Sequence, residues 1–230
     1  MSKGRIELFD ALRGLALYSM LIYHFAYDLA MFSFISWDDM FSLPMEIFER
    51  YICCSFIILA GISSCFSRNN LKRGALVFVC GLIVSLGSAI AGVTIRFGVL
   101  ELLGSSMMLY AVFGKYINKL GAALPIVCVP VFAAGYYVYR NVYVTIPWLY
   151  PFGLRTETFV SADYFPLWPW FFLFLIGTYI GRKVRSGERK PWMEKKYSKV
   201  LTVPGKHTLL IYMAHQPILY GITMLMAKVF

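Results

Sequence analysis

The chain has 230 residues, of which 59% are hydrophobic, 17% aromatic and only 15% charged. A soluble domain carries about 45–50% apolar and about 25% charged residues, so this composition excludes an ordinary soluble globule, a disordered chain and a small disulfide scaffold. We interpret the net charge of +10 as the cytoplasmic excess of lysine and arginine found in membrane proteins, not as a sign of nucleic-acid binding. The five cysteines lie in apolar runs without metal-ligand spacing, so we expect no metal site.

Seven apolar stretches follow one another along the chain. A helix needs about 20 residues to cross a hydrocarbon core of about 30 Å. We therefore predict an all-α fold, a polytopic transmembrane helical bundle that includes residues 1–230 as a single domain. The expected spans are 11–32, 47–67, 74–95, 97–117, 121–139, 164–181 and 207–227.

The distribution of lysine and arginine predicts the orientation of these spans. With the N-terminus in the cytoplasm and the C-terminus outside, the inner segments hold 17 of these cations, including Lys3, Arg5 and nine in 182–206. The outer segments hold five, which are Arg50, Arg96, Arg140, Arg155 and Lys228. This asymmetry follows the positive-inside rule. We expect an integral protein of the bacterial plasma membrane, in contact with membrane lipid, and the sequence leaves a homo-oligomer open.

The first span carries a stripe of ionisable residues. At 100° per residue, Asp10, Arg13, His24 and Asp28 fall, together with Gly14, Leu17 and Leu21, within a sector of about 100°. Lipid tails cannot solvate such a stripe, so we expect it to face the bundle interior or a wet cavity. His24 and Asp28 are four residues apart, and a carboxylate beside an imidazole makes a general base. The alternative is a buried pair that only fixes helix packing.

The spacing of Asp10 and Arg13 has two interpretations. Their spacing suits an ion pair at the start of the helix, and it equally suits a site that anchors a phosphate. Glu101, early in the fourth span, is a candidate proton carrier, a partner for Arg96 or a neutral acid.

Two further sites combine polar residues with proline. Asp163 precedes Pro166 and Pro169, which is typical of a helix N-cap, and the functional alternative is a ligand for a sugar hydroxyl. His215 and Gln216 lie in the last span before Pro217, and a polar pair beside a kink often lines a cavity. We expect His24 and His215 to line one cavity. The chain has no P-loop, HExxH, GxSxG or CxxC motif, so ATPase, zinc-protease and serine-hydrolase activities lose their usual support.

The order of these motifs resembles one family. The opening Arg5-Ile-Glu-Leu-Phe-Asp-Ala-Leu-Arg-Gly14, the segment His24-Phe-Ala-Tyr-Asp28 and the late segment Gly205-Lys-His-Thr-Leu-Leu-Ile-Tyr-Met-Ala-His-Gln-Pro217 are similar to the heparan-α-glucosaminide N-acetyltransferase catalytic-domain family of membrane proteins. Phe56-Ile-Ile-Leu-Ala-Gly61 and Asp163-Tyr-Phe-Pro-Leu-Trp-Pro-Trp170, followed by Gly177 and Gly181, agree with it.

The resemblance implies acyl transfer from acyl-coenzyme A, most simply acetyl-coenzyme A, on the cytoplasmic face to a carbohydrate-type acceptor. It carries a catalytic role to His24 and supporting roles to Asp10, Arg13 and Asp28. Our hypothesis is a membrane acyltransferase in which His24, oriented by Asp28, is the general base and basic inner residues hold the coenzyme A phosphates. The alternative is a proton-coupled transporter or permease that uses the same intramembrane His, Asp and Glu residues.

Overall fold

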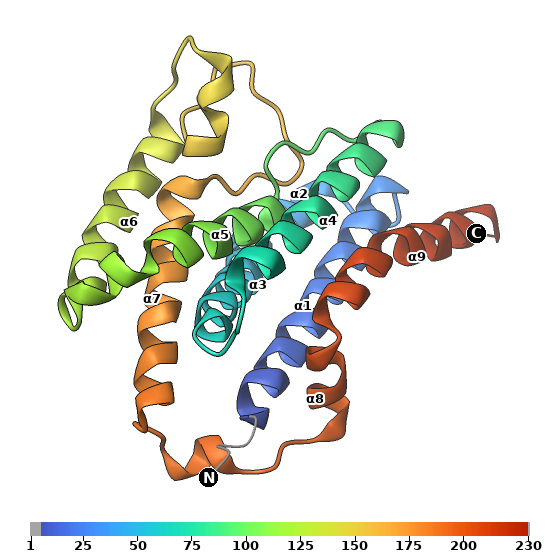
Figure 1. The fold of residues 1–230 in the computed structure, drawn as a ribbon. Coiled ribbons are helices and arrows are strands. Elements are labelled where there is room, and N and C mark those ends of the chain that lie inside the picture. Colours follow the sequence, from blue (N-terminus) through green and yellow to red (C-terminus); the bar gives the residue numbers. More distant parts are fainter. Residues whose placement is uncertain (1–5, 230) are drawn as a thin grey trace. The chain divides into compact units, whose positions relative to one another are not determined.

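The computed structural model describes residues 6–229, which form helices joined mostly by short connections, with a longer one over 142–166 (Figure 1). Within this range the extended pairing is an isolated bridge between Tyr143 and Arg155, so the predicted all-α class is confirmed. The long helices are α1 (Glu7–Met31), α3 (Leu43–Ser64), α4 (Asn70–Ile90), α5 (Val99–Ile117), α6 (Ala123–Asn141), α7 (Leu167–Ser186) and α9 (Thr208–Val229). The shorter ones are α2 (Trp37–Met40), η1 (Asn118–Leu120), η2 (Pro147–Phe152), η3 (Pro191–Glu194) and α8 (Lys199–Lys206).

Each long helix coincides with one predicted span to within five residues at either end. Among the described residues, α4, α6 and α9 are long and apolar enough to cross a membrane, with mean hydropathies of 1.9, 1.3 and 1.3. Their side chains are largely exposed, as on Leu82 and Leu86 of α4. Such continuous apolar surface on a folded chain marks contact with lipid or protein. Seven spans and the sides of the two termini remain predictions, and Lys3 and Arg5 lie outside the described residues.

The described chain forms two compact units, and the boundary between them falls within α3, after Phe56. The first unit comprises the residues up to Phe56 and those from Arg189 onward. In it, α1 packs against α8 and α9, as Figure 1 shows. The core beside these helices combines Leu17 and Met20 of α1 with Ile52 and Phe56 of α3.

One element of the first unit was missed from the sequence. The segment 182–206 was expected to be a loop, but its last part is α8, whose first turn is capped by Ser198 Oγ accepting from Val200 N–H. Gly205 lies against the backbone of Asp10, while Leu201 lies against Gly14. The two helices therefore run in opposite directions at very close range. The short amphipathic helix lacks the length of a span, which explains why hydropathy alone did not reveal it.

The second unit, Ile57–Glu188, contains the end of α3 and all of α4 to α7. Helices α4 and α5 pack together, as do α6 and α7. Gly61 lies against the backbone of Phe174, and Gly177 lies against that of Ile58. Gly181 in turn lies against Ile62, so residue numbers rise together along α3 and α7 and the two helices run in the same direction. This agrees with the predicted alternation, in which the second and sixth spans cross the same way.

Candidate active site

The structure brings His24 of α1 and His215 of α9 together. Their ring centroids are 4.7 Å apart and the planes meet at 89°, an edge-to-face contact. His215 is buried, with 6% of its surface exposed, and His24 is half-buried. The sequence analysis expected these two residues, 191 positions apart, to line one cavity. The structure shows their rings in contact, and a cavity lined by both stays a prediction.

Each imidazole is held by a main-chain carbonyl of its own helix. His24 Nδ1 lies 3.0 Å from the carbonyl oxygen of Met20, and His215 Nδ1 contacts that of Tyr212. Because a carbonyl oxygen can only accept, the neutral rings carry their hydrogen on Nδ1 and keep a lone pair on Nε2. Both histidines are therefore set up as bases at Nε2.

Asp28 is paired with Gln216, whereas the sequence pattern paired it with His24. Gln216 Nε2 donates to Asp28 Oδ1 over 2.8 Å, and Asp28 is completely buried. No hydrogen bond or ion pair joins His24 to Asp28 within residues 6–229. Asp28 therefore contacts the residue that follows His215, and it links α1 to α9.

The same cluster contains hydrogen-bond acceptors without donors. Among the described residues, His215 Nε2, Asp28 Oδ2 and Gln216 Oε1 are buried and have no hydrogen-bond partner. A buried polar atom without a partner costs about 1–3 kcal/mol. Because all three atoms accept, the site is suited to a ligand that donates, such as a hydroxyl or an amine.

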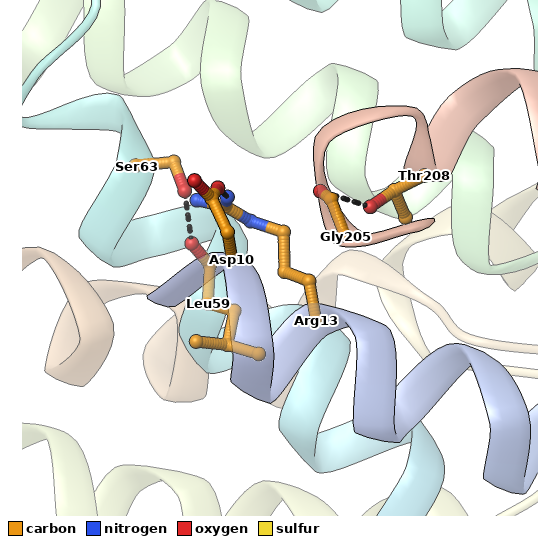
Figure 2. A network of polar contacts seen from close by, with 6 residues as sticks. All are labelled: Asp10, Arg13, Leu59, Ser63, Gly205 and Thr208. Carbon is orange, nitrogen blue, oxygen red and sulfur yellow. Dashed lines mark hydrogen bonds and ion pairs between the residues drawn. The ribbon is translucent and has the colours of Figure 1, made fainter. Parts of the chain in front are cut away.

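Asp10 and Arg13 form the ion pair that their spacing predicts. Arg13 Nη1 lies 2.7 Å from Asp10 Oδ1, and Asp10 is 1% exposed (Figure 2). Figure 2 also shows Thr208 at the start of α9, where its hydroxyl donates to the carbonyl oxygen of Gly205 over 2.8 Å. Asp10 offsets the positive charge of Arg13. A role for Arg13 in anchoring phosphate stays a prediction.

The other two candidates, Glu101 and Asp163, both accept hydrogen bonds from backbone N–H groups at the N-terminus of α5 in the second unit. Glu101 accepts from the hydroxyl of Ser85 over 2.6 Å and from Gly98 N–H over 2.5 Å. Asp163 Oδ2 accepts from Val99 N–H over 3.0 Å. The sequence-based N-cap interpretation of Asp163 therefore named the right role on the wrong helix, because α7 begins after Pro166 and Asp163 caps α5.

Among residues 6–229, no group of three or more His, Cys, Asp or Glu side chains is arranged to hold a metal ion. The family profile described as "Heparan-alpha-glucosaminide N-acetyltransferase, catalytic" matches residues 5–217. The chain belongs to this family. No curated protein and no solved structure was found to match it.

Membership of the heparan-alpha-glucosaminide N-acetyltransferase catalytic family, together with the exposed apolar helices, places the chain among integral membrane proteins of an acetyltransferase family. The match, over residues 5–217, includes the whole second unit, most of the first and every candidate residue. The motif glycines also gain a physical reason: Gly14 and Gly205 let α1 and α8 touch backbone to backbone, and Gly61 and Gly177 do the same for α3 and α7. A Cβ atom at any of the four would overlap a neighbouring carbonyl oxygen.

Proposed function

We propose that the protein is an acyl-coenzyme A-dependent membrane acyltransferase with His24 as the general base. The observation that carries the proposal is the contact between His24 and His215 beside three buried acceptor atoms that lack donors. A carbohydrate-type acceptor presents several hydroxyl or amino groups, each of which donates hydrogen bonds. One such group would bind at His215 Nε2 and at the Asp28–Gln216 pair while another faces His24.

The chemistry requires one base and one bond exchange. The acceptor oxygen or nitrogen forms a bond to the acyl carbon as the C–S bond of the thioester breaks. The proton of the acceptor passes to His24 Nε2 and then to the departing thiolate sulfur. The carbonyl of Met20 holds the ring so that Nε2 remains the basic atom.

The directions of the helices support access from two sides. Helix α9 runs alongside α1 in the same direction, since His24 faces His215 and Phe32 faces Tyr220 further along. If both cross the membrane from the cytoplasm, the acyl donor enters near Arg13 and the basic 189–206 segment of the same unit, and the acceptor reaches the histidines from the opposite end. This arrangement corresponds to a bacterial plasma-membrane enzyme with its C-terminus outside.

The test is acyl transfer by the purified protein. Labelled acetyl-coenzyme A is incubated with amino and hydroxyl sugars, and both thiol release and labelled sugar are measured. General base catalysis contributes about 10²–10⁴-fold, so His24→Ala lowers turnover at least about a hundredfold. His207→Ala is the matched control. Because His207 is exposed at the end of α8, this variant is expected to keep the turnover of the unchanged protein.

Two results would overturn the proposal. Equal turnover in His24→Ala and the unchanged protein removes His24 from the mechanism. A pH-driven flux of solute into liposomes without consumption of thioester indicates the permease instead, in which the same buried side chains bind protons or solute.

A further inference from the structure

A second polar site lies within the second unit and is formed by other residues than the candidate active site. A cavity of about 430 Å³ opens where α3 ends, α4 begins and α5 ends. Its lining includes Arg68, Asn70, Leu71, Tyr110, Lys115 and Asn118. None of these residues is one of the eight candidate site residues, although Arg68 and Lys115 belong to the basic inner residues that the sequence hypothesis gave to the coenzyme A phosphates.

Positive charge gathers at this end of the unit. Arg182 Nη1 donates to the carbonyl oxygen of Asn118 over 3.1 Å, and Arg185 donates to that of Cys65 over 2.5 Å, so the end of α7 meets the ends of α5 and α3. The segments 65–73, 114–121 and 182–188 together carry eight cations: Arg68, Lys72, Arg73, Lys115, Lys119, Arg182, Lys183 and Arg185. The one carboxylate in these segments is Glu188, which pairs with Lys183.

The guanidinium of Arg182 contributes a largely unpaired positive charge at this end of the unit. Its Nε and Nη2 are buried and find no hydrogen-bond partner among residues 6–229, where it also forms no ion pair. Burying a guanidinium without a counter-charge is costly. Arg182 Nη1 donates to the main-chain carbonyl of Asn118, which lines the cavity, and its ring neighbour is Tyr179, so Arg182 lies behind the lining. Arg68 and Lys115 in the lining are exposed and available to a ligand.

The ligand must also suit an apolar surface. Leu71 lines the cavity and begins a stripe of exposed side chains on one face of α4, continued by Val79, Leu82 and Leu86. These positions fall within about 80° of one another at 100° per residue, and the stripe runs about 22 Å along the helix axis. A molecule with an anionic head and long apolar tails matches both the cavity and the stripe.

We propose that this cavity is a specific site for the phosphate of an anionic phospholipid. Arg68 and Lys115 bind the phosphate oxygens through charge-assisted hydrogen bonds, and the charge of Arg182 behind the lining and the amino end of α4 add to the positive potential. The acyl chains lie along Leu71 and the exposed stripe that follows it. Anionic lipids of the cytoplasmic leaflet meet basic residues at this depth, so the site would fix the second unit against the inner membrane surface. The proposal does not depend on acyl transfer.

The experiment measures lipid retention by native mass spectrometry. Delipidated protein in detergent is titrated with short-chain phosphatidylglycerol, phosphatidylcholine, inorganic phosphate and coenzyme A, each separately. The unchanged protein retains one phosphatidylglycerol in preference to phosphatidylcholine. Arg68→Gln/Lys115→Gln weakens that binding about tenfold or more, the loss expected for charge-assisted hydrogen bonds. The matched control, Lys206→Gln/Lys228→Gln, removes two cations elsewhere and keeps the affinity.

Three outcomes would overturn the proposal. The first is equal phosphatidylglycerol affinity in the cavity variant and the unchanged protein. The second is displacement of the lipid by coenzyme A with the same sensitivity to Arg68→Gln/Lys115→Gln, which assigns the cavity to a nucleotide phosphate. The third is binding of inorganic phosphate as tight as that of the lipid, which removes the role of the apolar stripe.

Discussion

The bond between Asp28 and Gln216 gives a quantitative test of how α1 and α9 are joined. Gln216→Met keeps the length of the side chain but removes the donor that lies 2.8 Å from Asp28 Oδ1. The completely buried carboxyl of Asp28 then loses its remaining partner among the described residues. Leaving a buried polar group without a partner costs about 1–3 kcal/mol. For a chain of this size, about 2–4 °C of melting temperature corresponds to 1 kcal/mol, so Gln216→Met lowers the Tm by about 2–12 °C.

The partner substitution makes the prediction specific. Asp28→Leu alone leaves the amide of Gln216 without its hydrogen-bond acceptor, whereas replacing both partners by apolar groups changes the stability little. The double variant Asp28→Leu/Gln216→Met is therefore less destabilised than the sum of the single variants, with a coupling of about 0.5–3 kcal/mol. The assay is thermal unfolding followed by tryptophan fluorescence in one detergent.

The control is Asn141→Met, since this exposed amide donates to the carbonyl oxygen of Tyr137 in its own helix. It changes stability by less than about 0.5 kcal/mol. Strictly additive changes in the free energy of unfolding for Asp28→Leu and Gln216→Met would refute the reasoning, because they would mean that the two side chains do not interact.

Two further predictions concern packing and capping. Gly177→Ala places a Cβ atom against the carbonyl oxygen of Ile58 and destabilises the protein by about 1–3 kcal/mol. The Cβ atom of the control Gly87→Ala meets no atom within 4 Å, so this variant is neutral or stabilised by up to about 1 kcal/mol. Thermal unfolding compares the two variants, and equal Tm values would contradict the close α3–α7 contact. Asp163→Ala removes the cap from Val99 N–H and costs about 0.5–2 kcal/mol, whereas Asp163→Asn keeps an acceptor oxygen and loses less; a large loss of turnover in Asp163→Asn at unchanged stability would instead assign Asp163 to substrate binding.

The sequence alone determined the seven long helices and the class of protein. Apolar runs of about 20 residues and their flanking cations depend only on local composition and on the 3.6-residue repeat, so they located all seven long helices. The same repeat placed Asp10 and Asp28 on one face of α1, and both are buried as expected. The i, i+3 spacing also predicted the Asp10–Arg13 ion pair, because both side chains belong to one helix.

Only the tertiary structure decided which polar groups meet between helices. Spacing within α1 suggested that Asp28 orients His24, but Asp28 bonds to Gln216, 188 positions away, and His24 packs against His215. Asp163 caps α5, 64 residues earlier in the chain, by the same kind of contact. Helical periodicity states which side of a helix a residue occupies and carries no information about which neighbour that side faces. That choice is made where glycines let backbones approach, and where buried donors and acceptors must find one another to offset the loss of water.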